Sequence, residues 1–255
     1  MEVFVGQVMP YITVAIFLGG ITWRIWRWMI PRIVHNITLS PFASNWVEAV
    51  LHPVIQLLTM WNVLKFDRGL WPGAFLLHFA LINVLGGHVV GFYTLGEQFN
   101  WVAPRIITAE QSTAASDFLG TMFGLIFLLA LVWLLYRRFA VEKVKAVSAT
   151  SDYLHLVLLI TIACIGNYMR LVPEAHMTYA EVREFLAGLF LFQPLPFPDN
   201  AFFLYHFLFV QILMIVFPFS KLMHTFGMFW ERWIVNRPYK EWPVGLPGVQ
   251  VPLQK

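Results

Sequence analysis

Long apolar runs separated by short polar segments dominate the chain. Five runs are long enough to cross the hydrocarbon core of a bilayer as helices, and they cover roughly residues 4–28, 70–93, 117–136, 152–171 and 201–226. The pattern therefore predicts an all-α protein, an integral membrane bundle of five transmembrane helices in one domain over residues 1–255.

The segments between these runs predict smaller elements. Residues 42–64 are apolar but include Glu48, His52, Pro53 and Gln56, which is typical of an amphipathic interfacial helix, here with a kink at Pro53. Residues 94–116 and 172–200 are expected to be loops, the second with a short helix around residues 179–190. The proline-containing residues from about 228 to 255 are expected to form a tail on a surface or a partner.

The composition supports a membrane protein. Of 255 residues, 59% are hydrophobic and 12% charged, and the mean hydropathy is +0.68, which is too apolar for an ordinary soluble domain. The first run begins at Val3 without a basic segment or a cleavage site, so we expect a retained helix rather than a signal peptide. The net charge of +3 indicates no particular partner, and no nucleic acid is expected.

Cys164 is the only cysteine. One cysteine excludes an internal disulfide, a self-contained thiolate iron–sulfur centre and the C-x-x-C-H attachment of a c-type haem. Any metal must therefore be held by other ligands.

The positions of lysine and arginine predict the orientation in the membrane. All but three (Arg105, Arg170 and Arg183) lie from the end of the first run to the second, between the third and fourth, or from the end of the fifth run onward. Because positive charge accumulates on the cytoplasmic side, the amino terminus should lie outside and the carboxyl terminus in the cytoplasm of a cell-membrane protein.

Four histidines lie within the second and fifth runs. The stretch LLHFALINVLGGHVVGF carries His78 and His88 without any charged residue, and the fifth run carries His206 and His224. Antiparallel pairing of the two helices would place His88 opposite His206 toward the outside, and His78 opposite His224 toward the cytoplasm.

Two imidazoles that face each other in an apolar core suit the axial ligation of a b-type haem, so the two pairs predict two haems. Gly86, Gly87 and Gly91 would leave room for a macrocycle beside His88. Ten helical residues rise about 15 Å and eighteen about 27 Å. The two spacings therefore differ, and we expect helix tilt and a kink at Pro218 to absorb the difference.

Other functions remain open at this point. The histidines could serve as a proton path, with polar neighbours at Asn83, Thr121, Asn167 and Gln211, or could bind a non-haem metal. The chain could also be a passive anchor for a soluble enzyme. The remaining histidines (His35, His52, His155 and His176) are interpreted as structural.

Two blocks resemble the gamma subunit of respiratory nitrate reductase, a di-haem cytochrome b family. They are LHFALINVLGGHVVGF and HFLFVQILMIVFPFSKLMHTF, with weaker support from TSDYLHLVLLITIACIGNYMRL and Arg237-Pro238-Tyr239. The wider family includes the cytochrome b subunits of dissimilatory sulfite reductase-linked and heterodisulfide reductase-like complexes.

The resemblance implies a fold, cofactors and partners. It implies five transmembrane helices with the amino terminus outside, an outer haem b on His88 and His206, and an inner haem b on His78 and His224. Such a subunit oxidises menaquinol or ubiquinol beside the outer haem, here at His88 and Gly87, and passes electrons to cytoplasmic iron–sulfur and catalytic subunits. The family uses a lysine in the loop after the second span, where this chain has Arg105 instead. The same chain of haems could also reduce a quinone.

Overall fold

The computed structural model describes residues 1–30, 45–93 and 106–235, and these residues are helical with no strand among them. The α-helices are α1 (Met9–Met29), α2 (Trp46–Thr59), α3 (Trp61–Phe66), α4 (Leu70–Tyr93), α6 (Ala109–Ala140), α7 (Glu142–Ala146), α8 (Thr150–Leu171), α9 (Tyr179–Phe190), α10 (Ala201–Val216) and α11 (His224–Val235). A π-helical turn (Phe4–Val8) precedes α1, and 3₁₀ turns lie at Pro173–Ala175, Phe217–Phe219 and Lys221–Met223.

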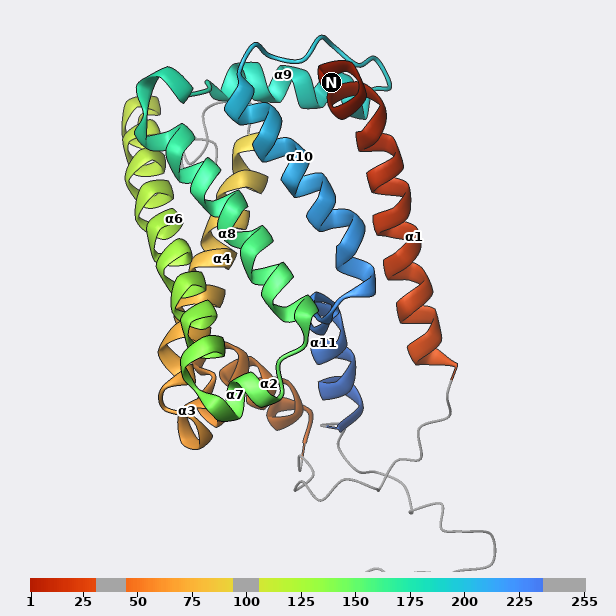
Figure 1. Ribbon diagram of the computed structural model, residues 1–255, viewed down its shortest axis with the longest axis vertical. Helices are drawn as coiled ribbons and strands as arrows, with labels where there is room; N and C mark the ends of the chain where they lie inside the picture. Colours follow the sequence, from red (N-terminus) through yellow and green to blue (C-terminus); the bar gives the residue numbers. More distant parts are fainter. Residues whose placement is uncertain (31–44, 94–105, 236–255) are drawn as a thin grey trace, which may run out of the picture.

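Five helical segments are long and apolar enough to cross a membrane, which confirms the predicted number of spans. They are Phe4–Met29, Leu70–Val89, Ala109–Ala140, Thr150–Leu171 and Ala201–Phe219. They run side by side along the long axis of the molecule, while α9 crosses one end of the bundle beside the amino terminus (Figure 1). The short helix expected at residues 179–190 is confirmed as α9.

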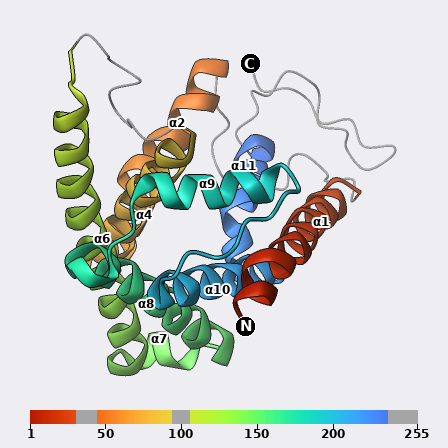
Figure 2. The ribbon, with the colours of Figure 1, turned by 90° about the horizontal axis from the view of Figure 1, so that it is seen from above.

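The long helices pack in sequence around the bundle. Helix α4 packs on α6, α6 on α8, α8 on α10, and α10 on α1. Helices α4 and α10 share no comparable contact, and α11 lies between α1 and α4 when the bundle is seen from above (Figure 2). Helices α4 and α10 therefore belong to one bundle without packing extensively on each other.

Small residues bring these helices into close contact. A buried cluster of Ala80, Phe127, Leu131, Leu156 and Ala163 joins α4, α6 and α8. An added Cβ at Gly73 would lie 2.4 Å from Trp133, and one at Gly124 would lie 2.5 Å from Asn167. These glycines allow an indole and an amide to lie against the neighbouring backbone.

The fifth span differs from the prediction. A single kinked helix over residues 201–226 was predicted, and this prediction was wrong. Helix α10 ends at Val216, just before Pro218, which has no N–H to donate. Ser220 is extended (φ −112°, ψ 175°), and its Oγ accepts a hydrogen bond of 3.1 Å from the Leu222 N–H. His224 therefore begins a separate helix, and the 27 Å rise expected for a continuous helix does not apply.

Three other boundaries differ from the prediction. Helix α6 begins at Ala109, inside the expected loop, because the Thr108 hydroxyl accepts from the Gln111 N–H and the Gln111 side chain accepts from the Thr108 N–H. Helix α2 runs through Pro53 and ends at Met60, which has a φ of 48°. Helix α11 also continues into the expected tail, of which residues 236–255 lie outside the described part.

The short helices and the described connections lie at the two ends of the bundle. The amino terminus, the α8–α9 connection and α9 lie at one end, whereas α2, α3, α7 and the end of α11 lie toward the other (Figure 1). The second group carries Lys65, Arg68, Lys143 and Lys145. We call the first end the amino-terminal end and the second the basic end.

Candidate functional site

His78 and His224 form one pair, toward the basic end. Their ring centroids lie 5.9 Å apart with an interplanar angle of 80°. A metal–imidazole bond is about 2 Å long, so two imidazoles that bind one metal from opposite sides have centroids about 6 Å apart. The observed separation fits a shared metal, and it also falls within the range of an edge-to-face aromatic pair.

The other predicted pair, His88 on α4 and His206 on α10, lies toward the amino-terminal end, with the two rings within electrostatic range of each other. The His206 ring packs against α8 at Gly166, where an added Cβ would lie 3.1 Å from His206 Cε1. Sequence reasoning missed this role of Gly166, because only the fold shows that it faces His206.

Hydrogen bonds set the tautomer of three of the four rings. The Nδ1 atoms of His78, His88 and His224 lie 2.8, 2.7 and 3.0 Å from the carbonyl oxygens of Ala74, Val84 and Lys221. A carbonyl only accepts, so each Nδ1 carries the proton and each Nε2 keeps its lone pair. This is the state in which a histidine binds a metal through Nε2.

The fourth ring differs. The Ile162 backbone on α8 is the polar group that interacts with this buried ring, and Nδ1 makes no hydrogen bond of regular geometry among the described residues.

The backbone beside His88 is open. Added Cβ atoms at Gly86 and Gly87 would meet no described atom within 4 Å. The space next to these glycines can admit a flat apolar group against α4. Arg105, the other residue assigned to the quinol site, lies outside the described residues.

Three of the four polar groups proposed for a proton path make hydrogen bonds to nearby backbone carbonyls, and the fourth, Thr121, lines a pocket described below. The Asn83 amide donates to Phe79 O at 2.8 Å, Asn167 to Gly124 O at 3.0 Å, and Gln211 to Val5 O at 3.0 Å. Each of these side-chain amides donates to a backbone carbonyl of its own or a neighbouring helical segment, which is typical of a structural role. One histidine interpreted as structural, His155 on α8, has a buried Nε2 without a partner among the described residues.

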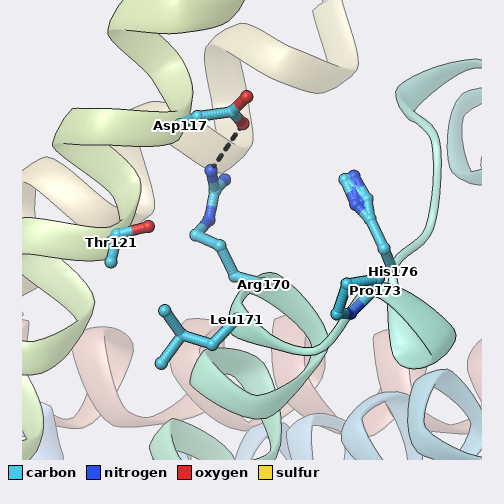
Figure 3. A pocket seen from close by; sticks show the side chains of 6 residues that line it. All are labelled: Asp117, Thr121, Arg170, Leu171, Pro173 and His176. Carbon is cyan, nitrogen blue, oxygen red and sulfur yellow. Dashed lines mark hydrogen bonds and ion pairs between the residues drawn. The ribbon is translucent and has the colours of Figure 1, made fainter.

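A polar pocket of about 470 Å³ lies at the amino-terminal end, between α6 and the end of α8 (Figure 3). The Arg170 guanidinium donates to Ser116 O and to Asp117 Oδ1, both at 3.1 Å. Thr121, Leu171, Pro173 and His176 complete the lining. Arg170 is one helical turn beyond Gly166, so the pocket begins about 6 Å along α8 from the residue that contacts His206.

Comparison with known proteins identifies the family. The family described as nitrate reductase gamma subunit matches residues 62–240, a range that includes all four paired histidines. The chain belongs to this family. Its relatives include the Hdr-like menaquinol oxidoreductase cytochrome b-like subunits of Archaeoglobus fulgidus (28% identity, 90% of this chain and 78% of the relative) and Archaeoglobus profundus (27%, 89% and 77%). The nitrate reductase gamma chain of Bacillus subtilis is 24% identical over 87% of this chain and 89% of its own length.

Membership of the nitrate reductase gamma subunit family makes this chain a multi-pass membrane protein of an oxidoreductase, and a cytochrome b-like family implies haem. The histidine pairs fit that group. Within the described ranges no three or more His, Cys, Asp or Glu side chains converge on a metal position. A haem needs no such cluster, because the porphyrin supplies four ligands and the protein only the axial ones.

Proposed function

We propose that this chain is the di-haem cytochrome b subunit of a quinol oxidoreductase. It oxidises a membrane quinol near its outer, amino-terminal end and delivers the electrons to an iron–sulfur partner at its basic, cytoplasmic end. The observation that supports the proposal is the approach of the His78 and His224 rings to 5.9 Å, with His88 and His206 as the second predicted pair toward the other end.

The four histidines are the proposed axial ligands. His88 and His206 would hold the outer haem, and His78 and His224 the inner one. Bound haem supplies one-electron chemistry at its iron. The carbonyls of Ala74, Val84 and Lys221 keep three of the rings in the Nε2-binding tautomer.

The quinol site is proposed beside His88 and Gly87, at the end where the polar pocket lies. Oxidation of a quinol releases two protons with two electrons, and the protons need acceptors that lead away from the apolar core. The pocket lined by Asp117 and His176 lies at that end, and the protons would leave through it to the outside.

The more similar relatives favour a particular partner. The two Archaeoglobus proteins are subunits of an Hdr-like menaquinol oxidoreductase, and both are somewhat more similar to this chain than the Bacillus nitrate reductase subunit is. Arg237-Pro238-Tyr239, which gave weaker support to the resemblance to the nitrate reductase gamma subunit, lies outside the described residues. We therefore take menaquinol as the substrate, a heterodisulfide reductase-like partner as the first candidate, and nitrate reductase as the second.

The test is reduction by quinol. Membranes that contain the chain should show a reduced b-type spectrum on addition of a menaquinol analogue, and the replacement His206→Leu should abolish that reduction while dithionite still reduces the remaining haem. Equal quinol reduction in the His206→Leu chain would contradict the proposed outer site. A folded chain that binds no haem would favour the passive anchor.

A further inference from the structure

A buried carboxylate lies at the start of α8, near the beginning of α11. The Asp152 side chain is only 5% exposed. Lys221 Nζ lies 2.8 Å from its Oδ1 and 2.9 Å from its Oδ2, Arg138 Nη1 lies 3.4 Å from Oδ2, and the Ala149 N–H donates to Oδ2 at 3.0 Å. The carboxylate therefore joins the ends of α6 and α8 to the turn after α10.

The same lysine holds a proposed haem ligand. The Lys221 carbonyl accepts the Nδ1 hydrogen bond of His224 at 3.0 Å, while the Lys221 ammonium binds Asp152. Lys221 opens the 3₁₀ turn Lys221–Met223, and His224 follows it directly. A movement of Lys221 would consequently turn the His224 ring. It would also break the hydrogen bond that keeps the proton on Nδ1.

We propose that Asp152, acting through Lys221, is a positioning residue that aims His224 Nε2 at the inner haem; this inference rests on the proposed function. His224 needs such support because the fifth span is broken, so that a continuous α10 does not hold this residue in place. Anchors independent of Lys221 are the close approach of Pro218 to Gly20, 2.6 Å from an added Cβ, and the buried side chain of Met223. They fix the turn on either side of Lys221, and the ion pair fixes Lys221 itself.

The ion pair is well placed for such a role. Burial of a carboxylate is costly unless cations and hydrogen bonds compensate for the lost water, and Asp152 has both. Lys221 is 68% exposed at its side chain, so without Asp152 its ammonium would turn to solvent. Partners that orient a metal-binding histidine typically change metal affinity by about 10- to 100-fold when they are removed.

Replacements of Lys221 separate positioning from a general role in the fold. Asp152 also binds Arg138, so Asp152→Asn alters the α6–α8 contact as well as the His224 turn. Lys221→Met removes only the ammonium and keeps a long side chain, and Lys221→Arg restores a positive charge. Asp67→Asn is the matched control, because Asp67 and Arg137 form an ion pair of 2.8 Å that contacts none of the four paired histidines through any described hydrogen bond.

The experiment uses the full chain in membranes, with haem content per chain and a redox titration of the b-type spectrum. His206→Leu, which by the proposed function keeps only the inner haem, assigns the inner signal. We expect Lys221→Met and Asp152→Asn to weaken retention of the inner haem about tenfold or to shift its potential. The outer haem should be unchanged, Lys221→Arg should recover most of the inner signal, and Asp67→Asn should match the wild type.

Three results would overturn the inference. The first is an unchanged inner haem in Lys221→Met. This result would show that the Lys221 ammonium does not position His224, even if Asp152→Asn fails to accumulate. The second is equal loss of both haems, which would indicate general destabilisation. The third, a wild-type chain without haem, would overturn the proposed function as well and is recognised before any variant is made.

Discussion

The rings of His78 and His224 lie 5.9 Å apart, although one belongs to α4 and the other to α11. Their Nδ1 atoms donate to Ala74 O and Lys221 O, so the Nε2 atoms of both remain available. A structural pair of buried histidines would satisfy each other by a hydrogen bond between nitrogens. Here the backbone occupies one nitrogen of each ring, which is the arrangement that a metal ligand needs.

Gly166 tests the outer pair. An added methyl group would lie 3.1 Å from the His206 ring and displace it by a few tenths of an ångström. We expect Gly166→Ala to lower outer-haem content or shift the outer-haem potential, as measured by redox titration. Gly19→Ala is the control, because a Cβ at Gly19 meets no described atom within 4 Å. Identical titrations for the two variants would contradict the proposed packing of His206.

Gly86 tests whether a macrocycle lies beside α4. In the chain alone an alanine at this position meets no described atom, and it should stabilise a helix by about 0.5–1 kcal/mol. We expect Gly86→Ala to accumulate normally in membranes but to lose haem or change its spectrum, because the methyl group enters the space assigned to the porphyrin. A more stable variant with unchanged haem would place the macrocycle elsewhere.

Asn83 separates electron transfer from proton conduction. Its amide donates to Phe79 O on its own helix, and it lies on the opposite face of α4 from His78 and His88. The replacement Asn83→Leu should therefore leave haem content and quinol-driven reduction unchanged. Proton flux measured in vesicles with a pH-sensitive dye provides the converse test, and a flux that depends on Asn83 would support the proton path.

The ion pair of Asp67 and Arg137 predicts a dependence of stability on pH. The Arg137 guanidinium, together with the Leu70 N–H, holds the pKa of the Asp67 carboxyl below its ordinary value of 3.8. A lowered pKa contributes stability that is fully present above the ordinary value and is lost as the pH falls through the lowered one. Asp67 is 42% exposed, so the contribution should stay below about 1 kcal/mol.

Thermal unfolding of the solubilised protein between pH 2 and 6 measures this effect. The wild type should lose stability below about pH 4, and Asp67→Asn should lose less of it over the same interval because it lacks the titrating group. Parallel curves for the two proteins would show that Asp67 is not the group that titrates.

Much of the fold follows from the sequence because lipid imposes simple rules. Apolar length alone located the five spans, and Asn45, Thr108 and Asn200 mark helix starts through caps that local sequence contains. The end of α10 was misjudged because Pro218 can either kink a helix or end it. The extended backbone at Ser220, which decides between these outcomes, depends on tertiary contacts.

The sequence proposes the ligands of the site but gives no indication of the residues that support them. The four histidines are conspicuous in apolar helices, and their pairing follows from antiparallel direction. The contacts of Gly166 with His206 and of Asp152 with Lys221 join residues far apart in the chain, so no local pattern indicates them. They became visible only once α8 was placed between α6 and α10.

The most direct measurement is the haem content of the purified chain and of four variants, His78→Leu, His88→Leu, His206→Leu and His224→Leu, by the pyridine haemochrome assay. The account predicts about two b haems per wild-type chain and about one in each variant. It further predicts that His78→Leu and His224→Leu leave the same spectrum, different from the spectrum shared by the other two. A folded wild type without haem, or a variant series in which the spectra do not group in these pairs, would contradict it.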